Sequence, residues 1–155
     1  MITSASNPRL RLVRRLASRR QRERLGLFSC EGEDLVGAAV AAGLAPVELL
    51  VDAERPPDGL PPGERVEPKV LADVSTLAHP PRAIGIFRLD ELPQLDLAVP
   101  PPVGLALWHV SDPGNVGTLA RAADGFGPAF LALSPGCADP VGPRALRASA
   151  GAAFR

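Results

Sequence analysis

A glycine-containing turn between an apolar run and a helix is the segment of this sequence best placed to do chemistry. Val103–Val110 has the continuous apolar character of a buried parallel strand, Ser111–Val116 forms a turn, and Gly117–Gly125 is predicted to be a helix. Glycine in the turn lets a ligand approach the backbone, and the helix start favours anions. The chain contains neither GxGxxG nor GxxxxGK(S/T), which disfavours dinucleotide and Walker-type sites. On spacing alone, the alternative to a ligand-binding turn is a tight turn with only a structural role.

The charge of the chain is uneven. Residues 1–24 contain eight arginines and one acid, a net charge of +7, and the remainder carries −7. A helix is predicted from Asn7-Pro8, because Asn caps helices and Pro suits their first position. Four arginines recur at spacings that share one face of this helix: Arg11, Arg15, Arg19 and Arg22. A merely solvated face is the alternative, but a charge of this size favours contacts with the phosphates of a polyanion.

Strands and helices alternate around these two segments, which predicts an α/β protein. Up to residue 90, we expect strands at 25–30, 46–52 and 83–89, helices at 33–42 and 69–77, and a Pro-rich loop at 55–63. The stretch 90–102 contains a proline triplet and is typical of a linker. A second unit then opens with a βαβ arrangement: strand 103–110, helix 117–125, strand 128–133, and a further helix from Pro143.

Composition limits the class of protein. The chain is 46% hydrophobic, enough for a core, and it has no apolar run as long as a membrane span. Its N-terminus lacks the apolar core of a signal peptide. Cys30 and Cys137 are far apart in sequence, and no Cys/His cluster has metal-ligand spacing. We therefore expect a cytoplasmic protein with reduced thiols, no metal site and no membrane contact.

A longer pattern around the turn is more specific. The run Asp112–Gly127 (DPGNVGTLARAADGFG) closely resembles the first signature motif of the SpoU (TrmH-like) RNA 2′-O-ribose methyltransferases, in the SPOUT superfamily. Further segments resemble the same family in the same order: Asn7-Pro8-Arg9 and Phe28–Val36 in front, and Cys137–Pro140, Arg144 and Arg147–Arg155 behind. The resemblance covers nearly the whole chain in register.

This resemblance implies a domain plan and a chemistry. Residues 1–90 would form an L30e-like α/β domain that binds RNA, residues 91–102 a linker, and residues 103–155 the first part of an α/β-knot (Rossmann-like) methyltransferase domain. The family works as a dimer and takes its methyl group from S-adenosylmethionine. Its substrates are ribosomal and transfer RNA, and the extra L30e-like domain favours ribosomal RNA, with 23S rRNA as the expected target.

The resemblance also implies roles for single residues. Asn115 and Arg121 match the catalytic Asn and Arg of the motif. Because Arg stays protonated, a positioning and charge-stabilising role for Arg121 is favoured over that of a general base. The alternatives are that Asn115 only stabilises the turn and that Arg121 only pairs with Asp124. The expected RNA contacts are Arg9, Arg11, Arg15, Arg19, Arg22, Arg144 and Arg147. Few aromatics accompany them, which favours recognition of backbone and shape over base stacking.

Two further family motifs follow the point that corresponds to Arg155. The resemblance implies that they hold the knot and most of the donor pocket, so no cofactor-binding residue is assigned in this chain. We expect the chain to be C-terminally truncated and unable to bind the donor by itself. Two other hypotheses remain: a non-catalytic RNA-binding module with an L30e-like fold, and a nucleotide-binding α/β protein of another kind. Glu31, in a family-like turn, is expected to order the basic arm by pairing with an arginine.

Overall fold

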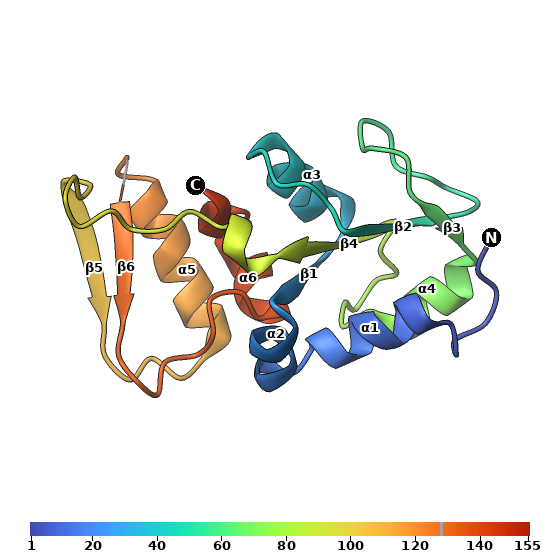
Figure 1. The fold of residues 1–155 in the computed structure, drawn as a ribbon, viewed down its shortest axis with the longest axis horizontal. Helices are drawn as coiled ribbons and strands as arrows, with labels where there is room; N and C mark the ends of the chain where they lie inside the picture. The colour runs from blue at the N-terminus through green and yellow to red at the C-terminus, as the bar shows by residue number, and fades with distance from the viewer. Residues whose placement is uncertain (128) are drawn as a thin grey trace. The chain divides into compact units, whose positions relative to one another are not determined.

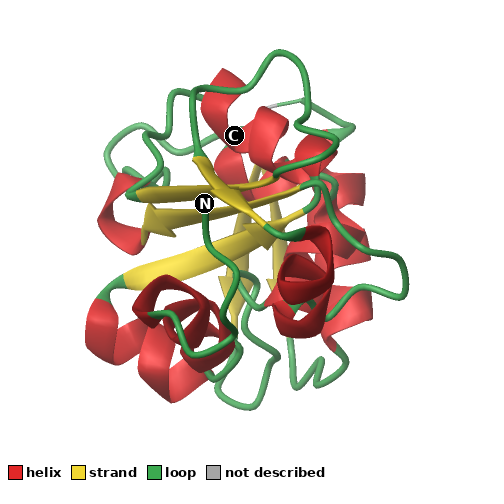
Figure 2. Ribbon diagram, turned by 90° about the vertical axis from the view of Figure 1, so that its right-hand side faces the viewer, coloured by secondary structure: helices red, strands yellow, loops and turns green. Residues whose placement is uncertain are grey.

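The computed structural model describes residues 1–127 and 129–155, which form two compact units, Met1–Glu91 and Leu92–Arg155. Each unit combines strands with helices (Figures 1 and 2), so the α/β class predicted from the sequence is confirmed. Pro128, the first residue of a predicted strand, lies outside the described residues. Among the described residues, no helix is long and apolar enough to cross a membrane.

A four-stranded sheet forms the centre of the first unit. Its strands are β1 (Leu27–Glu31), β2 (Glu48–Asp52), β3 (Glu64–Val66) and β4 (Ala83–Arg88), in the order β1-β4-β2-β3. Strand β4 is antiparallel to both of its neighbours, whereas β2 and β3 are parallel. Strand β3 was not predicted, because three residues are too few to show an alternating pattern.

Helices cover both faces of this sheet (Figure 1). Helices α1 (Pro8–Leu16) and α4 (Pro68–Val74) lie on one face, and α3 (Glu33–Ala41) lies on the other. Leu10, Val13 and Leu16 project from α1 into a buried cluster that also contains Ile84 and Ile86 of β4. The alternation of apolar residues along β4 therefore supplies two cores, one on each side of the sheet.

The basic arm is not one helix, and the prediction of a continuous helix is wrong. Helix α1 ends at Leu16, and a second helix, α2 (Arg19–Leu25), begins after Ser18, whose backbone is extended. Gly26, in the left-handed region with φ of 66°, ends α2 and leads into β1. The break changes which faces the arginines occupy, because helical spacing applies only within each helix.

The second unit contains a parallel pair of strands and two packed helices. Strands β5 (Val103–Leu107) and β6 (Ala129–Leu133) pair in parallel, and α5 (Pro113–Asp124) connects them. Helix α6 (Pro143–Ser149) packs against α5 so closely that a Cβ on Gly117 would lie 2.2 Å from the Ala145 carbonyl oxygen. Short 3₁₀ helices lie at Leu89–Glu91 (η1), at the end of the first unit, and at Ala152–Phe154 (η2), in the second.

Candidate functional site

Helix α5 starts earlier than the sequence predicted. It begins at Pro113 instead of Gly117, because Asp112 acts as its N-cap: the Asp112 Oδ1 accepts a hydrogen bond from the Asn115 backbone N–H at 2.9 Å. Asn115 therefore lies in the first turn of the helix and not in a preceding loop. Its side chain is exposed and makes no hydrogen bond with any residue that the structure describes. The stabilising role considered for Asn115 belongs to Asp112.

Arg144 of α6 lies at this helix start. One of its terminal nitrogens is 3.3 Å from the Asp112 Oδ2, and a Cβ on Gly114 would lie 2.9 Å from the Asp112 Oδ1. Glycine at position 114 thus leaves room for the capping carboxylate of Asp112. The Arg144 side chain is still 67% exposed, so it can pair with Asp112 and meet a phosphate with its remaining N–H groups. Arg147, one helical turn further along α6, is exposed.

Arg121 lies on the exposed surface of α5, towards its C-terminal end. The expected alternative partner, Asp124, instead pairs with Arg155 at 2.6 Å, and this hydrogen bond lowers the pKa of Asp124. Arg121 has no side-chain ion pair or hydrogen bond within the described residues. Asn115 and Arg121 are separated by about 9 Å along the helix axis and about 120° around it. The structure therefore leaves both side chains available but does not bring them into contact.

A hydrogen bond joins the segments that follow the carboxyl ends of the two parallel strands, β5 and β6. His109 follows β5 in the left-handed region, with φ of 51°, and its backbone N–H donates to Ser134 Oγ, just after β6, at 2.9 Å. The Trp108 ring meets the His109 ring edge to face, with centroids 5.0 Å apart. Neither His109 nor Trp108 was among the site residues predicted from the sequence. The signal available in the sequence was a single tryptophan directly after an apolar run.

A cavity of about 760 Å³ lies elsewhere in the second unit. Its walls come from the segment 92–101, the C-terminal half of α5, strand β6 and the region around η2. Its lining includes Asp124 and Arg155 but none of the site residues predicted from the sequence. Cavity size alone therefore does not locate the chemistry in this unit.

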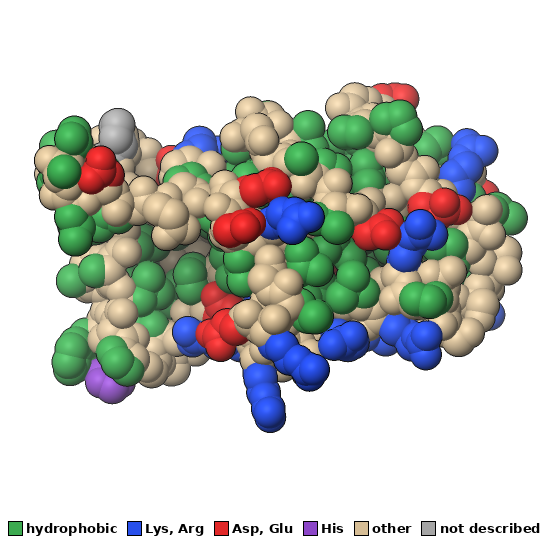
Figure 3. Space-filling view, in the orientation of Figure 1, with side chains coloured by type: hydrophobic (Ala, Val, Ile, Leu, Met, Phe, Trp, Pro, Cys, Tyr) green, Lys and Arg blue, Asp and Glu red, His purple; other side chains and the backbone are tan. Residues whose placement is uncertain are grey.

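The basic residues of the first unit gather over α1 and α2. Figure 3 shows lysine and arginine side chains in a row along this edge. Arg22 does not belong to the exposed row, so its predicted place on a shared surface is wrong. It is only 3% exposed, and its Nη1 donates to the carbonyl oxygens of Leu16 at 2.8 Å and Ala17 at 3.0 Å. Arg22 caps the end of α1 because the break after Ala17 turns α2 back towards those carbonyls.

The remaining arginines of the arm differ in how strongly they are engaged. Arg9 pairs with Glu48 at 2.8 Å and Arg19 with Glu23 at 2.8 Å, while Arg15 donates to Gln21 at 3.2 Å. Three others are exposed and make no side-chain hydrogen bond or ion pair with the described residues: Arg11, Arg20 and Arg24. These three are the arginines most available to an external phosphate, and only Arg11 was singled out from the sequence.

Glu31 does not pair with an arginine of the arm, which corrects the expectation from the sequence. Its carboxylate is buried and accepts hydrogen bonds from the Ser75 hydroxyl at 2.7 Å and from the Thr76 backbone N–H at 2.7 Å. The Thr76 hydroxyl donates to the same carboxylate at 3.0 Å. Glu31 therefore fixes the segment after α4 against the end of β1, a structural role.

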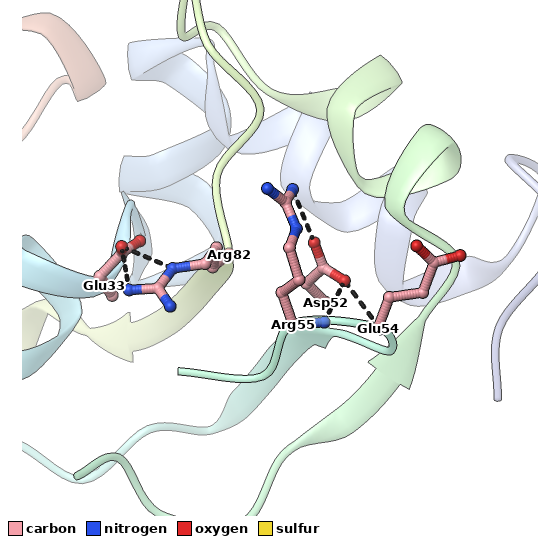
Figure 4. A network of polar contacts seen from close by, with 5 residues as sticks. All are labelled: Glu33, Asp52, Glu54, Arg55 and Arg82. Atoms are coloured by element: carbon pink, nitrogen blue, oxygen red, sulfur yellow. Dashed lines mark hydrogen bonds and ion pairs between the residues drawn. The ribbon is translucent and has the colours of Figure 1, made fainter. Parts of the chain in front are cut away.

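Two further carboxylates organise the loops of the first unit (Figure 4). Partial burial raises the pKa of Glu33, but its own backbone N–H and the Arg82 guanidinium, which donates at 2.8 Å, outweigh this and leave it lowered. Burial likewise opposes ionisation of Asp52. The backbone N–H groups of Arg55 and Glu54 and the Arg55 guanidinium outweigh it, so the pKa of Asp52 is also lowered. Both pairs are structural supports and lie outside the predicted site.

Among the described residues, no group of His, Cys, Asp and Glu could hold a metal ion.

The comparisons with known proteins agree for both units. Residues 7–85 match the MRM3-like substrate binding domain, and residues 102–155 match the SpoU rRNA Methylase family. The 23S rRNA (guanosine(2553)-2′-O)-methyltransferase RlmP of Bacillus subtilis is 30% identical to this chain. The match covers 99% of this chain and 62% of RlmP. Mitochondrial rRNA methyltransferase 3 of Homo sapiens is 33% identical, and the match covers 89% of this chain and 36% of the human protein.

A solved structure agrees with this assignment. The AdoMet-bound rRNA methyltransferase from Sinorhizobium meliloti superposes with a TM-score of 0.80 at 28% identity, over 99% of this chain and 61% of its own. The matches define a class of α/β proteins in which a substrate-binding unit precedes a methylase unit. The chain belongs to the SpoU rRNA methylase family and carries an MRM3-like substrate-binding domain at its front, so the resemblance seen in the sequence is confirmed. It spans 36% to 62% of the length of these curated relatives.

Proposed function

We propose that the protein to which this chain belongs methylates the 2′-hydroxyl of a ribose in ribosomal RNA, with S-adenosylmethionine as the methyl donor. The observation that carries the proposal is the placement of the motif residues. Asn115 and Arg121 project from α5 into solvent, and no described residue engages either side chain. Polar side chains held on a rigid helix without internal partners are suited to an external ligand. The match of residues 102–155 to the SpoU family supports this assignment.

Ribose methylation needs a hydroxyl made more nucleophilic, because a neutral alcohol is a poor nucleophile. Arg121 supplies a permanent positive charge, which stabilises the oxygen as its proton leaves and orients the neighbouring phosphate. The Asn115 amide, three residues after the helix cap, can donate to one sugar oxygen and accept from another. Arg144, anchored by Asp112 at 3.3 Å, adds a second cation at the helix start. These residues position the RNA, and the proton of the hydroxyl passes to solvent water instead of to one of them.

S-adenosylmethionine supplies an electrophilic methyl group when it is bound. The polar groups at the carboxyl ends of β5 and β6 already satisfy one another: His109 N–H donates to Ser134 Oγ, which donates to the Pro135 carbonyl at 3.1 Å. The Ala138 N–H likewise donates to the Val110 carbonyl at 2.9 Å. We therefore assign no residue of this chain to the donor and derive no step through it.

The basic arm of the first unit is proposed to bind the phosphates of the RNA substrate. The exposed arginines Arg11, Arg20 and Arg24 supply charge without an internal counter-ion among the described residues. Arg9, Arg15 and Arg19 have partners in the unbound chain and would exchange them for phosphates. Such contacts fix the position of the RNA but carry little sequence information. A homodimeric assembly and a cytoplasmic location, both expected from the sequence, remain predictions.

A methyl-transfer assay with the full-length protein tests the proposal. Labelled S-adenosylmethionine and ribosomal RNA are incubated with the unaltered protein, with Arg121→Ala and with Arg65→Ala, an exposed arginine of β3 that serves as the control. We expect Arg121→Ala to lose about 100-fold in rate, as when a charge-stabilising group is removed from an active site. Arg65→Ala should retain its rate. Equal rates for the two variants would remove Arg121 from the site.

The second hypothesis, a non-catalytic RNA-binding module, is favoured by the match of residues 7–85 to a substrate-binding domain. It predicts RNA binding through the arm with no methyl transfer under any condition. The same assay separates the two hypotheses when RNA binding is measured alongside it. Binding without transfer by the full-length protein would favour the module.

A further inference from the structure

Trp108 is the single tryptophan of the chain, and 77% of it is exposed. We propose that its indole stacks on a base of the RNA substrate and holds the strand next to the ribose that is methylated. The inference rests on the function proposed above and adds a contact that neither the sequence pattern nor the charged residues indicated. It confines base stacking to one residue, while the arginines of the arm contact phosphate.

The position of Trp108 in the fold favours a ligand contact. It follows Leu107, the last residue of β5, at the carboxyl end of the parallel pair. In open α/β sheets, ligands bind at the carboxyl ends of the strands. Only residues 109–112 separate Trp108 from the start of α5, the helix that carries Asn115 and Arg121. The indole and the proposed catalytic side chains thus belong to one strand–turn–helix segment.

The Trp108 indole contacts the ring of its neighbour His109, whose backbone is fixed. His109, whose ring meets the indole at an interplanar angle of 79°, is fixed through its backbone N–H to Ser134. Its φ of 51° is uncommon for a residue with a side chain, and such backbone strain is concentrated at functional sites. Gly136 leaves room for the imidazole, since a Cβ there would lie 2.7 Å from His109 Nδ1. An aromatic side chain has only two rotatable bonds, so it loses little conformational entropy on binding.

Charge and shape favour a nucleic-acid base as the occupant. The exposed cations of this unit include Arg121, Arg144 and Arg147, which favour an anionic partner, and a flat indole favours a flat ring. A second copy of the chain is less well supported, because the exposed aromatic residues do not form one patch. Phe126, which is 82% exposed, follows the C-terminal end of α5, whereas Trp108 precedes its N-terminal end.

Tryptophan fluorescence of the full-length protein tests the inference. The emission that Trp108→Phe removes is taken as the Trp108 signal. The probes are a 12-nucleotide single-stranded RNA and an abasic ribose-phosphate oligomer of the same length. Binding of each probe is followed independently by the fluorescence anisotropy of a label on the probe. We expect RNA to quench the Trp108 emission over the same concentration range in which it binds. The abasic oligomer should bind through phosphate contacts without quenching it, and acrylamide should quench Trp108 in the free protein.

Affinity measurements complete the test. Trp108→Ala should weaken RNA binding about ten-fold, within the range known for single base–aromatic stacks, and should leave abasic binding unchanged. Trp108→Phe should retain part of the affinity, and Phe126→Ala is the control for loss of an exposed ring. RNA binding with unchanged Trp108 emission would overturn the inference and leave the proposed function standing. So would equal quenching by the abasic oligomer, or protection from acrylamide that rises with protein concentration. Failure of RNA to bind at all would overturn both.

Discussion

Arg22 and Arg11 show that neighbouring arginines of one basic segment do different things. Arg22 is buried and satisfies two carbonyl groups at the end of α1, whereas Arg11 is exposed. We predict that Arg22→Ala lowers the free energy of unfolding by about 2 kcal/mol, because it leaves buried carbonyls without a donor. Arg11→Ala should leave stability within about 0.5 kcal/mol. Chemical denaturation of both variants measures the difference, and equal stabilities would contradict the structural role of Arg22.

Asp52 gives a prediction about pH. Its side chain is 1% exposed and its pKa is lowered, because the backbone N–H groups of Arg55 and Glu54 and the Arg55 guanidinium outweigh the effect of burial. A carboxylate with a lowered folded pKa stabilises the fold above its unfolded pKa of about 4, and this stabilisation is lost as the pH falls through the lower folded value. Asp52→Asn should therefore lower stability at pH 7 by about 1 kcal/mol and flatten its decline below about pH 4. An unchanged slope below that pH would contradict this account.

At the level of elements, α5 and α6 depend on one glycine. A Cβ at Gly117 would lie 2.2 Å from the Ala145 carbonyl oxygen and 2.7 Å from Ala148 Cβ, so Gly117→Ala must push the helices apart. We predict a loss of about 2 kcal/mol or more in stability, measured by thermal unfolding. Gly37→Ala in α3 is the matched control: its nearest neighbour would be the Leu60 side chain at 3.7 Å, an ordinary contact. That variant should be neutral or slightly more stable, since alanine favours helix.

Elements whose sequence carries a strong local pattern were predictable. The apolar runs at β2, β4 and β5 predicted strands close to their observed bounds, and the glycines and prolines marked most turns. The start of α5 was placed four residues late, because DPGN reads as a turn until Asp112 is known to cap Asn115. The break between α1 and α2 was missed because Ala17-Ser18 carries no strong break signal.

Side-chain roles were harder to predict than elements, because they depend on tertiary contacts. Sequence spacing placed Arg22 on a shared face, but only the fold shows that it turns inward to the end of α1. Glu31 was expected to pair with an arginine, and its actual partners lie 44 and 45 residues away in the chain. The motif positions of Asn115 and Arg121 were found from the sequence, but their exposure required the structure.

At the scale of the whole molecule, the neutral net charge combines an excess of positive charge in residues 1–24 with an equal excess of negative charge in the rest of the chain. The first unit carries the arginines that are proposed to hold RNA, and the second carries the residues proposed to act on ribose. Replacing Arg11, Arg20 and Arg24 together by Gln should make RNA binding less dependent on salt, by about two units in the slope of log affinity against log salt. Replacing Arg65, Arg88 and Lys69 by Gln controls for net charge. A slope that falls equally in both triple variants would indicate nonspecific attraction.

The central claim is methylation of a ribose 2′-hydroxyl, and the position of the transferred label tests it most directly. The full-length protein is incubated with ribosomal RNA and labelled S-adenosylmethionine, and the RNA is then hydrolysed in alkali. A ribose without a free 2′-hydroxyl cannot assist cleavage of the adjacent phosphodiester. We therefore predict that the label is recovered in alkali-resistant dinucleotides and that Arg121→Ala slows its incorporation about 100-fold. Recovery of the label in mononucleotides, as for a methylated base, would contradict the account, and so would an RNA that binds the protein and remains unlabelled.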